Sequence, residues 1–373
     1  MPAKYVQQDV RAGNKSLIFT LMFPNEQYSR ADIARITGLS RVSTSSVISQ
    51  MLEMHMVREV GIMSREGRGK RATSVSVDGD YWRIITVDIS SAKTIIGAIT
   101  TLKAEVLEQM SIENPGAASG ADHSAEASFE AVSTLVTQLI EQSNAAHILG
   151  ISVSCSGAID HEGNVIRSTS LGWFHFPLAH LLHERFNLPV CVENDAHLAL
   201  LAERYLGRGT QNFLLVRMHR GVGAAIMIDD QLITGPTGAA GEIGHVVVEP
   251  NGQACVCGKR GCLETVVSVP KMRELITVDP SSRARVDAQA GQWLAMALAL
   301  PVNLLELNDI VIDGPEDVVD DELLHAIGLA LKQRVDSDFL TAPHLRRCEL
   351  GESAVLKGAA IKLVRTIVGQ TGR

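Results

Sequence analysis

The stretch GEIGHVVVEPNGQACVCGKRGCLE, residues 241–264, is the most informative part of this chain. It places one histidine and three cysteines within eighteen positions, with the spacing H-x9-C-x-C-x4-C: His245, Cys255, Cys257 and Cys262. Three thiolates and an imidazole form a common tetrahedral shell for Zn²⁺, and a shell filled by four protein ligands is structural. The alternative is a set of free thiols in a buried loop, although free cysteines seldom cluster in this way.

The pattern GEIGH followed by CxCGxxGCLE resembles the signature of the ROK family, which groups bacterial sugar-responsive repressors, open reading frames and sugar kinases. The resemblance extends from about residue 13 to the C-terminus. It implies an actin-like, ribonuclease-H-like fold in which two lobes enclose a cleft. It also implies a sugar or sugar derivative as the ligand of that cleft.

Composition and charge restrict the class of protein. A chain of 373 residues is long enough for two or three domains, and no apolar run reaches the length of a bilayer-spanning helix. Six cysteines, half of them in the candidate zinc loop, fit a reducing cytoplasm. Residues 1–78 contain eleven Lys/Arg and seven Asp/Glu, so they carry +4 and the remainder −12 of the total charge of −8. A basic segment before an acidic body indicates that only the front of the chain binds a polyanion.

The front of the chain has the pattern of a helix-turn-helix. Residues 14–23 have helical apolar spacing, Ser29 caps a helix over residues 30–37, and Gly38 begins a tight turn. Ser40 caps a third helix that is predicted to run to about His55. Two strands around the turn EGRGKR then predict a winged helix-turn-helix domain over residues 1–78.

Two groups of side chains in this domain are candidates for binding operator DNA. Short hydroxyl side chains let a helix lie deep in a major groove, and basic side chains bind phosphates or a narrow minor groove. The third helix offers Arg41, Ser43, Ser46 and Ser49, and the tip of the hairpin offers Arg65, Arg68, Lys70 and Arg71. The alternative is a solvated basic hairpin on a protein-interaction domain. ROK repressors carry a DNA-binding domain at this position, whereas ROK kinases generally lack it.

From Tyr81 onward, strands alternate with helices, which predicts an α/β region over residues 79–373. Strands are expected within residues 82–90, 93–100, 104–112, 148–160, 189–195, 212–218, 223–229 and 308–314. Helices are expected over residues 128–143, 196–207, 290–307 and 352–368. We expect lobe one to span about 79–195 plus the C-terminal helix, and lobe two about 196–350.

Polar residues at the carboxyl ends of strands line the ligand crevice in such folds. The strand at 189–192 ends in Glu193-Asn194-Asp195, which could bind sugar hydroxyls or equally cap the next helix. The resemblance to ROK proteins implies a sugar contact for Asn194 and Asp195. It implies sugar contacts also for Glu242, His245, Glu264 and Ser170, and a position beside the sugar for the loop at Gly157. At Ser170 relatives often have Asn, so the sugar contact there differs.

The ROK kinases also share two glycine-rich phosphate loops, and this chain departs from both. The first, DxGGTK, corresponds here to residues 88–93, DISSAK, and the second, GTGIGGG, to residues 219–225, HRGVGAA. Side chains in place of glycine obstruct the approach of backbone to phosphate. Because phosphoryl transfer depends mostly on positioning, we expect no kinase activity.

The sequence therefore predicts a cytoplasmic DNA-binding regulator, a homodimer or homotetramer, with one structural Zn²⁺ per chain and no contact with a membrane. A sugar or phosphorylated sugar would bind between the lobes and release a repressor from its operator. The alternatives are a ROK sugar kinase with an appended DNA-binding domain, an activator, and a regulator that answers to a phosphotransferase protein.

Overall fold

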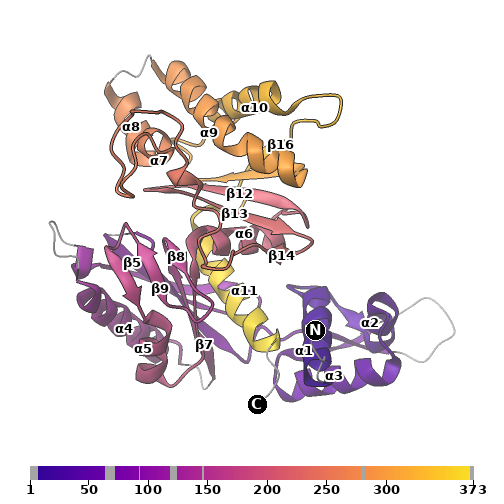
Figure 1. Cartoon of the computed structure of the whole chain (residues 1–373). Coiled ribbons are helices and arrows are strands. Elements are labelled where there is room, and N and C mark those ends of the chain that lie inside the picture. The colour runs from indigo at the N-terminus through magenta and orange to yellow at the C-terminus, as the bar shows by residue number, and fades with distance from the viewer. Residues whose placement is uncertain are drawn as a thin grey trace.

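The computed structural model describes residues 7–63, 72–91, 93–117, 124–144, 147–278 and 282–369. Three parts, called the head, lobe one and lobe two below, follow one another along the chain, except that the C-terminal helix returns to lobe one (Figure 1). In the part of the chain that the structure describes, no helix combines the length and the apolar character that a membrane span requires.

The head contains three helices and a three-stranded sheet of order β1-β3-β2. Its elements are α1 (Gln7–Met22), β1 (Tyr28–Ser29), α2 (Arg30–Thr37), α3 (Arg41–Glu53), β2 (Val57–Met63) and β3 (Ala72–Val77). The predicted caps are confirmed, because Ser29 and Ser40 accept hydrogen bonds from the backbone of the first turns of α2 and α3. Gly38 has φ of 72°, a conformation that glycine adopts without strain, and it separates the two helices.

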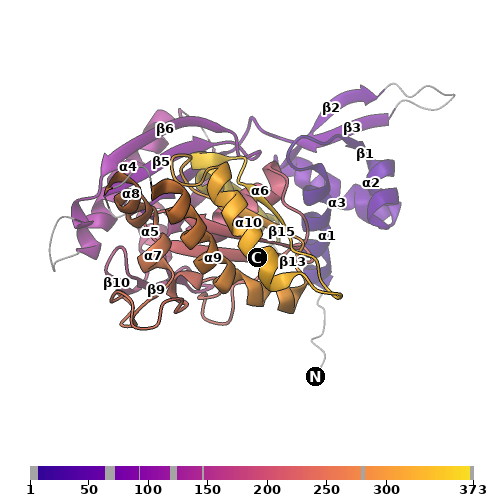
Figure 2. The same ribbon diagram turned by 90° about the horizontal axis from the view of Figure 1, so that it is seen from above.

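Two boundaries in the head differ from the prediction. Helix α1 begins at Gln7, seven residues before the apolar pattern starts, since a helix can extend beyond its apolar stripe. Helix α3 ends at Glu53, slightly before the predicted end at about His55, whose φ of 53° takes the backbone out of the helical conformation. The hairpin of β2 and β3 points away from the lobes (Figure 2).

Lobe one is built on a mixed five-stranded sheet of order β11-β7-β4-β5-β6. Its strands are β4 (Arg83–Asp88), β5 (Thr94–Thr100), β6 (Val106–Glu113), β7 (Ile148–Cys155) and β11 (Val190–Asn194). Helices α4 (Ala125–Gln142) and α5 (Leu178–Phe186) cover one face, and α11 (Ala354–Gly369) covers the other. A small sheet of β8 (Ala158–Ile159), β9 (Val165–Ser168) and β10 (Trp173–Phe176) follows β7.

Lobe two is built on a second five-stranded sheet, of order β14-β13-β12-β15-β16. Its strands are β12 (Phe213–Met218), β13 (Val222–Ile228), β14 (Gln231–Leu232), β15 (Asp309–Asp313) and β16 (His344–Arg347). Alternate residues of β12 face opposite sides, as a strand requires. Leu214 and Val216 pack with α9 (Arg283–Leu305) and α10 (Asp321–Val335), whereas Phe213 and Leu215 pack with α6 (Asp195–Leu206).

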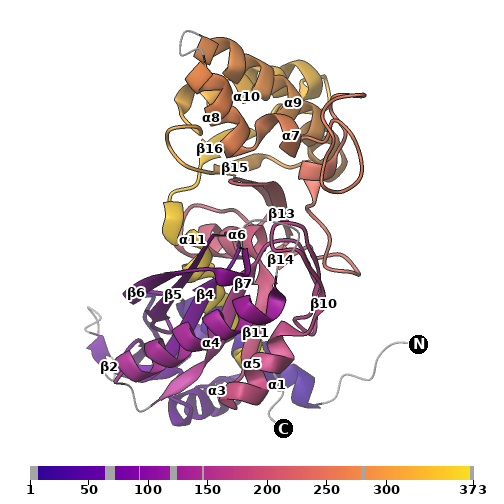
Figure 3. The ribbon, with the colours of Figure 1, turned by 90° about the vertical axis from the view of Figure 1, so that its left-hand side faces the viewer.

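Helices α6 and α11 therefore lie between the two sheets, and the other large helices of the lobes lie outside them (Figure 3). The central layer also joins the head to the lobes, because one hydrophobic core includes apolar side chains of α1, α3, α6 and α11. The predicted two-lobed α/β fold after an N-terminal helix-turn-helix with a β-hairpin is confirmed. The end of β11 and the start of α6 lie at the junction of the lobes. This segment carries Asn194 and Asp195, two of the predicted sugar-binding residues.

Candidate metal centre and the neighbouring polar residues

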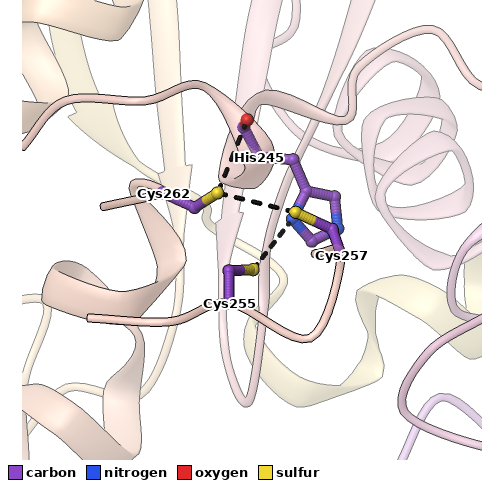
Figure 4. A group of neighbouring side chains, drawn as sticks. All are labelled: His245, Cys255, Cys257 and Cys262. Atoms are coloured by element: carbon purple, nitrogen blue, oxygen red, sulfur yellow. Dashed lines mark hydrogen bonds between the residues drawn. The ribbon is translucent and has the colours of Figure 1, made fainter. Parts of the chain in front are cut away.

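The histidine and the three cysteines of residues 241–264 converge on one point, as Figure 4 shows. Their ligand atoms all lie within 4.8 Å of one another. Two distances decide the fit: 3.6 Å from Cys257 Sγ to Cys262 Sγ, and 3.5 Å from Cys255 Sγ to His245 Nδ1. Zn²⁺ bonds of about 2.0–2.3 Å require tetrahedral edges of about 3.5–3.8 Å, so these two edges match a zinc ion and the remaining ones lie within 4.8 Å.

The loop that carries the cysteines needs glycine at one position above all. Gly261 has φ of 71°, and a Cβ at this position would lie 1.6 Å from the carbonyl oxygen of Glu249. This close approach lets the backbone turn back directly before Cys262. Burial raises the pKa of the Cys255 thiol, and the nearby Glu264 carboxylate adds to the effect, so a thiolate here requires a cation beside it.

His245 uses its two ring nitrogens in different directions. Nδ1 lies 3.4 Å from Glu264 Oε1 and beside the sulfur of Cys255, whereas Nε2 lies 3.8 Å from Glu242 Oε2. Burial raises the pKa of Glu242; His245 opposes this, and the charges of Asp195 and Glu264 add to it. The structure therefore brings four of the sequence-predicted sugar-site residues together: Asp195, Glu242, His245 and Glu264.

Asn194 has most of its hydrogen-bonding capacity occupied by the protein. Its Oδ1 accepts from the backbone N–H groups of Ala196 and His197 and so caps α6, and its Nδ2 donates to the carbonyl of Gly157 at 2.9 Å. The helix cap that the sequence left as an alternative is thus present. One N–H of the amide is left for a ligand.

Ser170 lies beside Ser156, the neighbour of Gly157 in the chain, in a group of three hydroxyls. Its Oγ is hydrogen-bonded to Ser156 Oγ and lies 3.3 Å from Ser168 Oγ. The hydroxyls of this group are half-buried or buried and can donate or accept.

A buried arginine beside these residues was not predicted from the sequence. Arg217, in β12, donates from Nε to Asp195 Oδ2 at 2.9 Å and from Nη1 to Asp313. Burial opposes the charge of Arg217, but Asp313, Asp195 and Asp88 overcome this and raise its pKa. The one available signal was an arginine inside the apolar strand FLLVRM, where a charge requires a partner.

The candidate DNA-binding residues divide into two groups. On α3, Arg41 and Ser46 are exposed, and Ser43 and Ser49 are half-buried. The four basic residues of the hairpin tip, Arg65, Arg68, Lys70 and Arg71, lie outside the described residues.

Comparison with known proteins decides the family. The sequence model described as "ROK family" matches residues 84–366. The chain belongs to the ROK family. The resemblance found in the sequence is thereby confirmed, and the match begins directly after the head.

Two curated relatives match nearly the whole chain. The DNA-binding transcriptional repressor Mlc of Escherichia coli is 24% identical, over 94% of this chain and 93% of that protein. The dual regulator NagC of Escherichia coli is 26% identical, over 94% of this chain and 92% of that protein.

Solved structures share the fold. A ROK family transcriptional regulator described as a homologue of Escherichia coli Mlc has a TM-score of 0.81 at 20% identity, covering 97% of both chains. A ROK family glucokinase from Streptomyces griseus, solved with glucose and AMPPNP, has a TM-score of 0.64 at 22% identity. It covers 74% of this chain and 98% of its own.

Proposed function

We propose that this chain is a cytoplasmic, sugar-responsive transcription regulator that represses by binding operator DNA. The observation that carries the proposal is a helix-turn-helix head, outside the residues matched by the family model, on a ROK body. Relatives that match over the head as well as the body are named repressors or regulators. We retain residues 1–78 as the DNA-binding domain and residues 79–373 as the sugar-binding and dimerisation region.

The head would bind DNA through α3. Arg41 and Ser46 are exposed, and Ser43 and Ser49 lie on the same helix, which is suited to a major groove. Arg65, Arg68, Lys70 and Arg71 would bind phosphates from the hairpin tip. The test is selection of a duplex from a randomised pool by the full-length protein, followed by measurement of its affinity for Arg41→Ala. Weaker binding and a flatter salt dependence support the role, and an unchanged affinity and salt slope refute it.

The sugar would bind at the start of α6, between Asn194 and Asp195 on one side and Glu242, His245 and Glu264 on the other. Gly157 and Ser170 would border it. Three carboxylates, Asp88, Asp195 and Asp313, act on the charge of the Arg217 guanidinium. The charges of Asp195 and of a further carboxylate, Glu264, act on Glu242. Such an acidic site repels phosphate, so of the two effector classes we favour an uncharged sugar. Calorimetry with D-glucose and D-glucose 6-phosphate tests the choice, since tighter binding of the phosphorylated sugar would contradict it.

The zinc ion would be held by His245, Cys255, Cys257 and Cys262 and would hold the loop that carries Glu264 beside the sugar. A metal on Nδ1 of His245 leaves Nε2, on the side of Glu242, as a donor for a sugar hydroxyl. One zinc ion per chain is expected from metal analysis of the purified protein. Protein that is fully folded without any bound metal would refute a structural zinc.

The rival function is a sugar kinase in which Asp195 acts as general base. The Arg217 guanidinium donates a hydrogen bond to Asp195 Oδ2 at 2.9 Å, so one oxygen of the carboxylate that would act as base is already engaged. The substituted phosphate loops oppose the same activity. Incubation with ATP, Mg²⁺ and a panel of hexoses distinguishes the functions, because turnover would support the kinase.

A homodimer or homotetramer would place two heads on paired half-sites. Helix α9 carries exposed apolar side chains at a spacing of four residues, with exposed fractions of 47, 65 and 72%: Met296, Leu300 and Leu304. This stripe is the surface we propose for self-association. Leu304→Glu should lower the mass measured by light scattering, and an unchanged mass would exclude this stripe.

A further inference from the structure

The head contacts lobe one through side chains next to their covalent junction. Tyr81 stacks between the rings of His55 in the head and His147 in lobe one, with centroids 3.7 and 3.9 Å away. Trp82 Nε1 donates to the carbonyl of Met54 at 2.9 Å. Helix α1 packs against the end of α11, which Figure 1 shows reaching from between the sheets to the head. The head is therefore fixed mainly to lobe one and to α11.

Helix α11 belongs mechanically to lobe one. It packs on β4, β7 and β11, and Lys362 Nζ lies 2.7 Å from Glu193 Oε2 at the end of β11. Both side chains of this ion pair are mostly buried, so the pair fastens the helix to the sheet.

Helix α6 packs more extensively on the lobe-two sheet than on the lobe-one sheet, although it also packs on α11 and its cap Asn194 bonds Gly157 in lobe one. It packs on β12 and β13, and ion pairs join both of its ends to the lobe-two sheet. The pairs are Asp195 with Arg217 at the start, and Glu203 with Arg346 and Arg204 with Asp230 at the end. A movement of lobe two therefore carries α6 with it.

The two helices cross at one close contact. A Cβ on Gly358 of α11 would lie 1.9 Å from the carbonyl oxygen of Leu198 in α6, so the backbones touch there. Leu198 is three residues from Asp195 and seven from Tyr205, which corresponds to about 5 and 10 Å of helix. A rotation of α6 about this crossing would move Tyr205 about twice as far as it moves the sugar-site end.

Tyr205 lies where the head, α6 and α11 meet. Its ring contacts Phe23 at the end of α1 edge to face, with centroids 6.1 Å apart. The guanidinium of Arg365 in α11 lies 4.9 Å from the same ring and donates to the Tyr205 hydroxyl. A small crevice lined by side chains of α1, α6 and α11 lies beside these contacts.

We propose that Tyr205 couples the cleft to the head: when the lobes close on a ligand, α6 turns against α11 and Tyr205 displaces the head through Phe23. The inference rests on the proposed function, since it names the route by which a sugar changes DNA binding. The movement is a shear, in which α6 slides against α11, and the two helices are attached to different lobes. A ligand drives it only by the difference in its affinity for the open and closed lobes.

The experiment measures the coupling between two ligands in full-length protein. The DNA is a duplex that the wild-type protein selects from a randomised pool, and the sugars are D-glucose, D-xylose and N-acetyl-D-glucosamine. The dissociation constant of the duplex is measured with and without saturating sugar for wild type, Tyr205→Ala and Tyr205→Phe. The phenylalanine variant is the matched control because it keeps the ring that contacts Phe23.

In the wild type, sugar should change the affinity for the duplex by about 5- to 150-fold, the usual range of such coupling. In Tyr205→Ala the ratio should fall to about 1, while the separate affinities for sugar and duplex stay within about threefold of wild type. Tyr205→Phe should keep most of the coupling. If Tyr205→Ala does not fold, Phe23→Ala removes the same contact from the head side and should give the same loss.

Two results overturn the inference in distinguishable ways. If the wild type couples the two ligands and the alanine variant retains that coupling, Tyr205 is not the route, and the proposed function stands. If the wild type binds none of the sugars or selects no duplex, the proposed function fails first.

Discussion

Removal of the Arg217 guanidinium is the sharpest test of the electrostatics between the lobes. In Arg217→Met the aliphatic volume remains, but Asp313, which is 3% exposed, loses its cationic partner. Breaking a buried ion pair by removing one partner costs about 3–5 kcal/mol. Asp195 is 18% exposed and keeps some hydration, so we expect about 3 kcal/mol. With a urea m-value of about 3 kcal/mol/M, the midpoint should fall by about 1 M.

The pH dependence of this loss has a defined sign. Burial disfavours the Asp313 carboxylate, but Arg217 and His219 overcome this and lower its pKa below 3.8. The stabilisation is present above pH 3.8 and is lost as the pH falls through the lowered pKa. In the variant, burial without the guanidinium raises the pKa of Asp313, so protonation relieves the buried charge already above pH 3.8. The difference between wild type and variant should therefore shrink as the pH falls from 7 towards 4.

Urea unfolding followed by tryptophan fluorescence at pH 7 and pH 4.5 measures both quantities. Arg217→Lys is the control, since it keeps the charge but not the planar group that reaches two carboxylates, and it should lose less stability. A loss below about 1 kcal/mol at pH 7, or one that is equal at both pH values, would show that Arg217 does not neutralise these carboxylates.

Three further outcomes are expected. For Glu193, burial opposes ionisation, but His197 and Lys362 lower its pKa from 4.5 to about 2. Glu193→Gln should therefore lower the free energy of unfolding by about 2–3 kcal/mol at pH 7, and this difference from wild type should shrink as the pH falls from 4.5 towards 2. Urea unfolding at a series of pH values measures it, and a difference that stays constant contradicts the pairing. Cys257→Ser should lose zinc and sugar binding together, and full zinc occupancy in metal analysis would refute its role as ligand. Gly358→Val should lower the thermal midpoint because the side chain meets the α6 backbone, whereas an unchanged midpoint would disprove that close contact.

Local chemistry made much of the fold predictable. Ser29, Gly38 and Ser40 identify the helix ends in the head, because a cap or a left-handed residue acts within one turn of its own position. The Cys/His spacing of the loop likewise predicts a cluster that the structure brings within 4.8 Å. These signals are short in sequence, so no knowledge of the tertiary fold is needed to interpret them.

The role of Arg217 could not be predicted from the sequence, because its partner is distant along the chain. Its partner Asp313 is 96 residues away, and the two meet because β12 and β15 pair in parallel with these residues in register. Nothing near Arg217 in the sequence identifies that register.

At Asn194 the sequence left two roles open, a sugar contact and a helix cap. In the structure the amide caps α6 and binds Gly157, so it fixes the helix start that presents Asp195. The same residue can thus serve the fold and leave one N–H for a ligand. The start of α6 therefore supports the fold by itself and is also where we propose the sugar binds, so substitutions there should be judged by stability and by ligand affinity together.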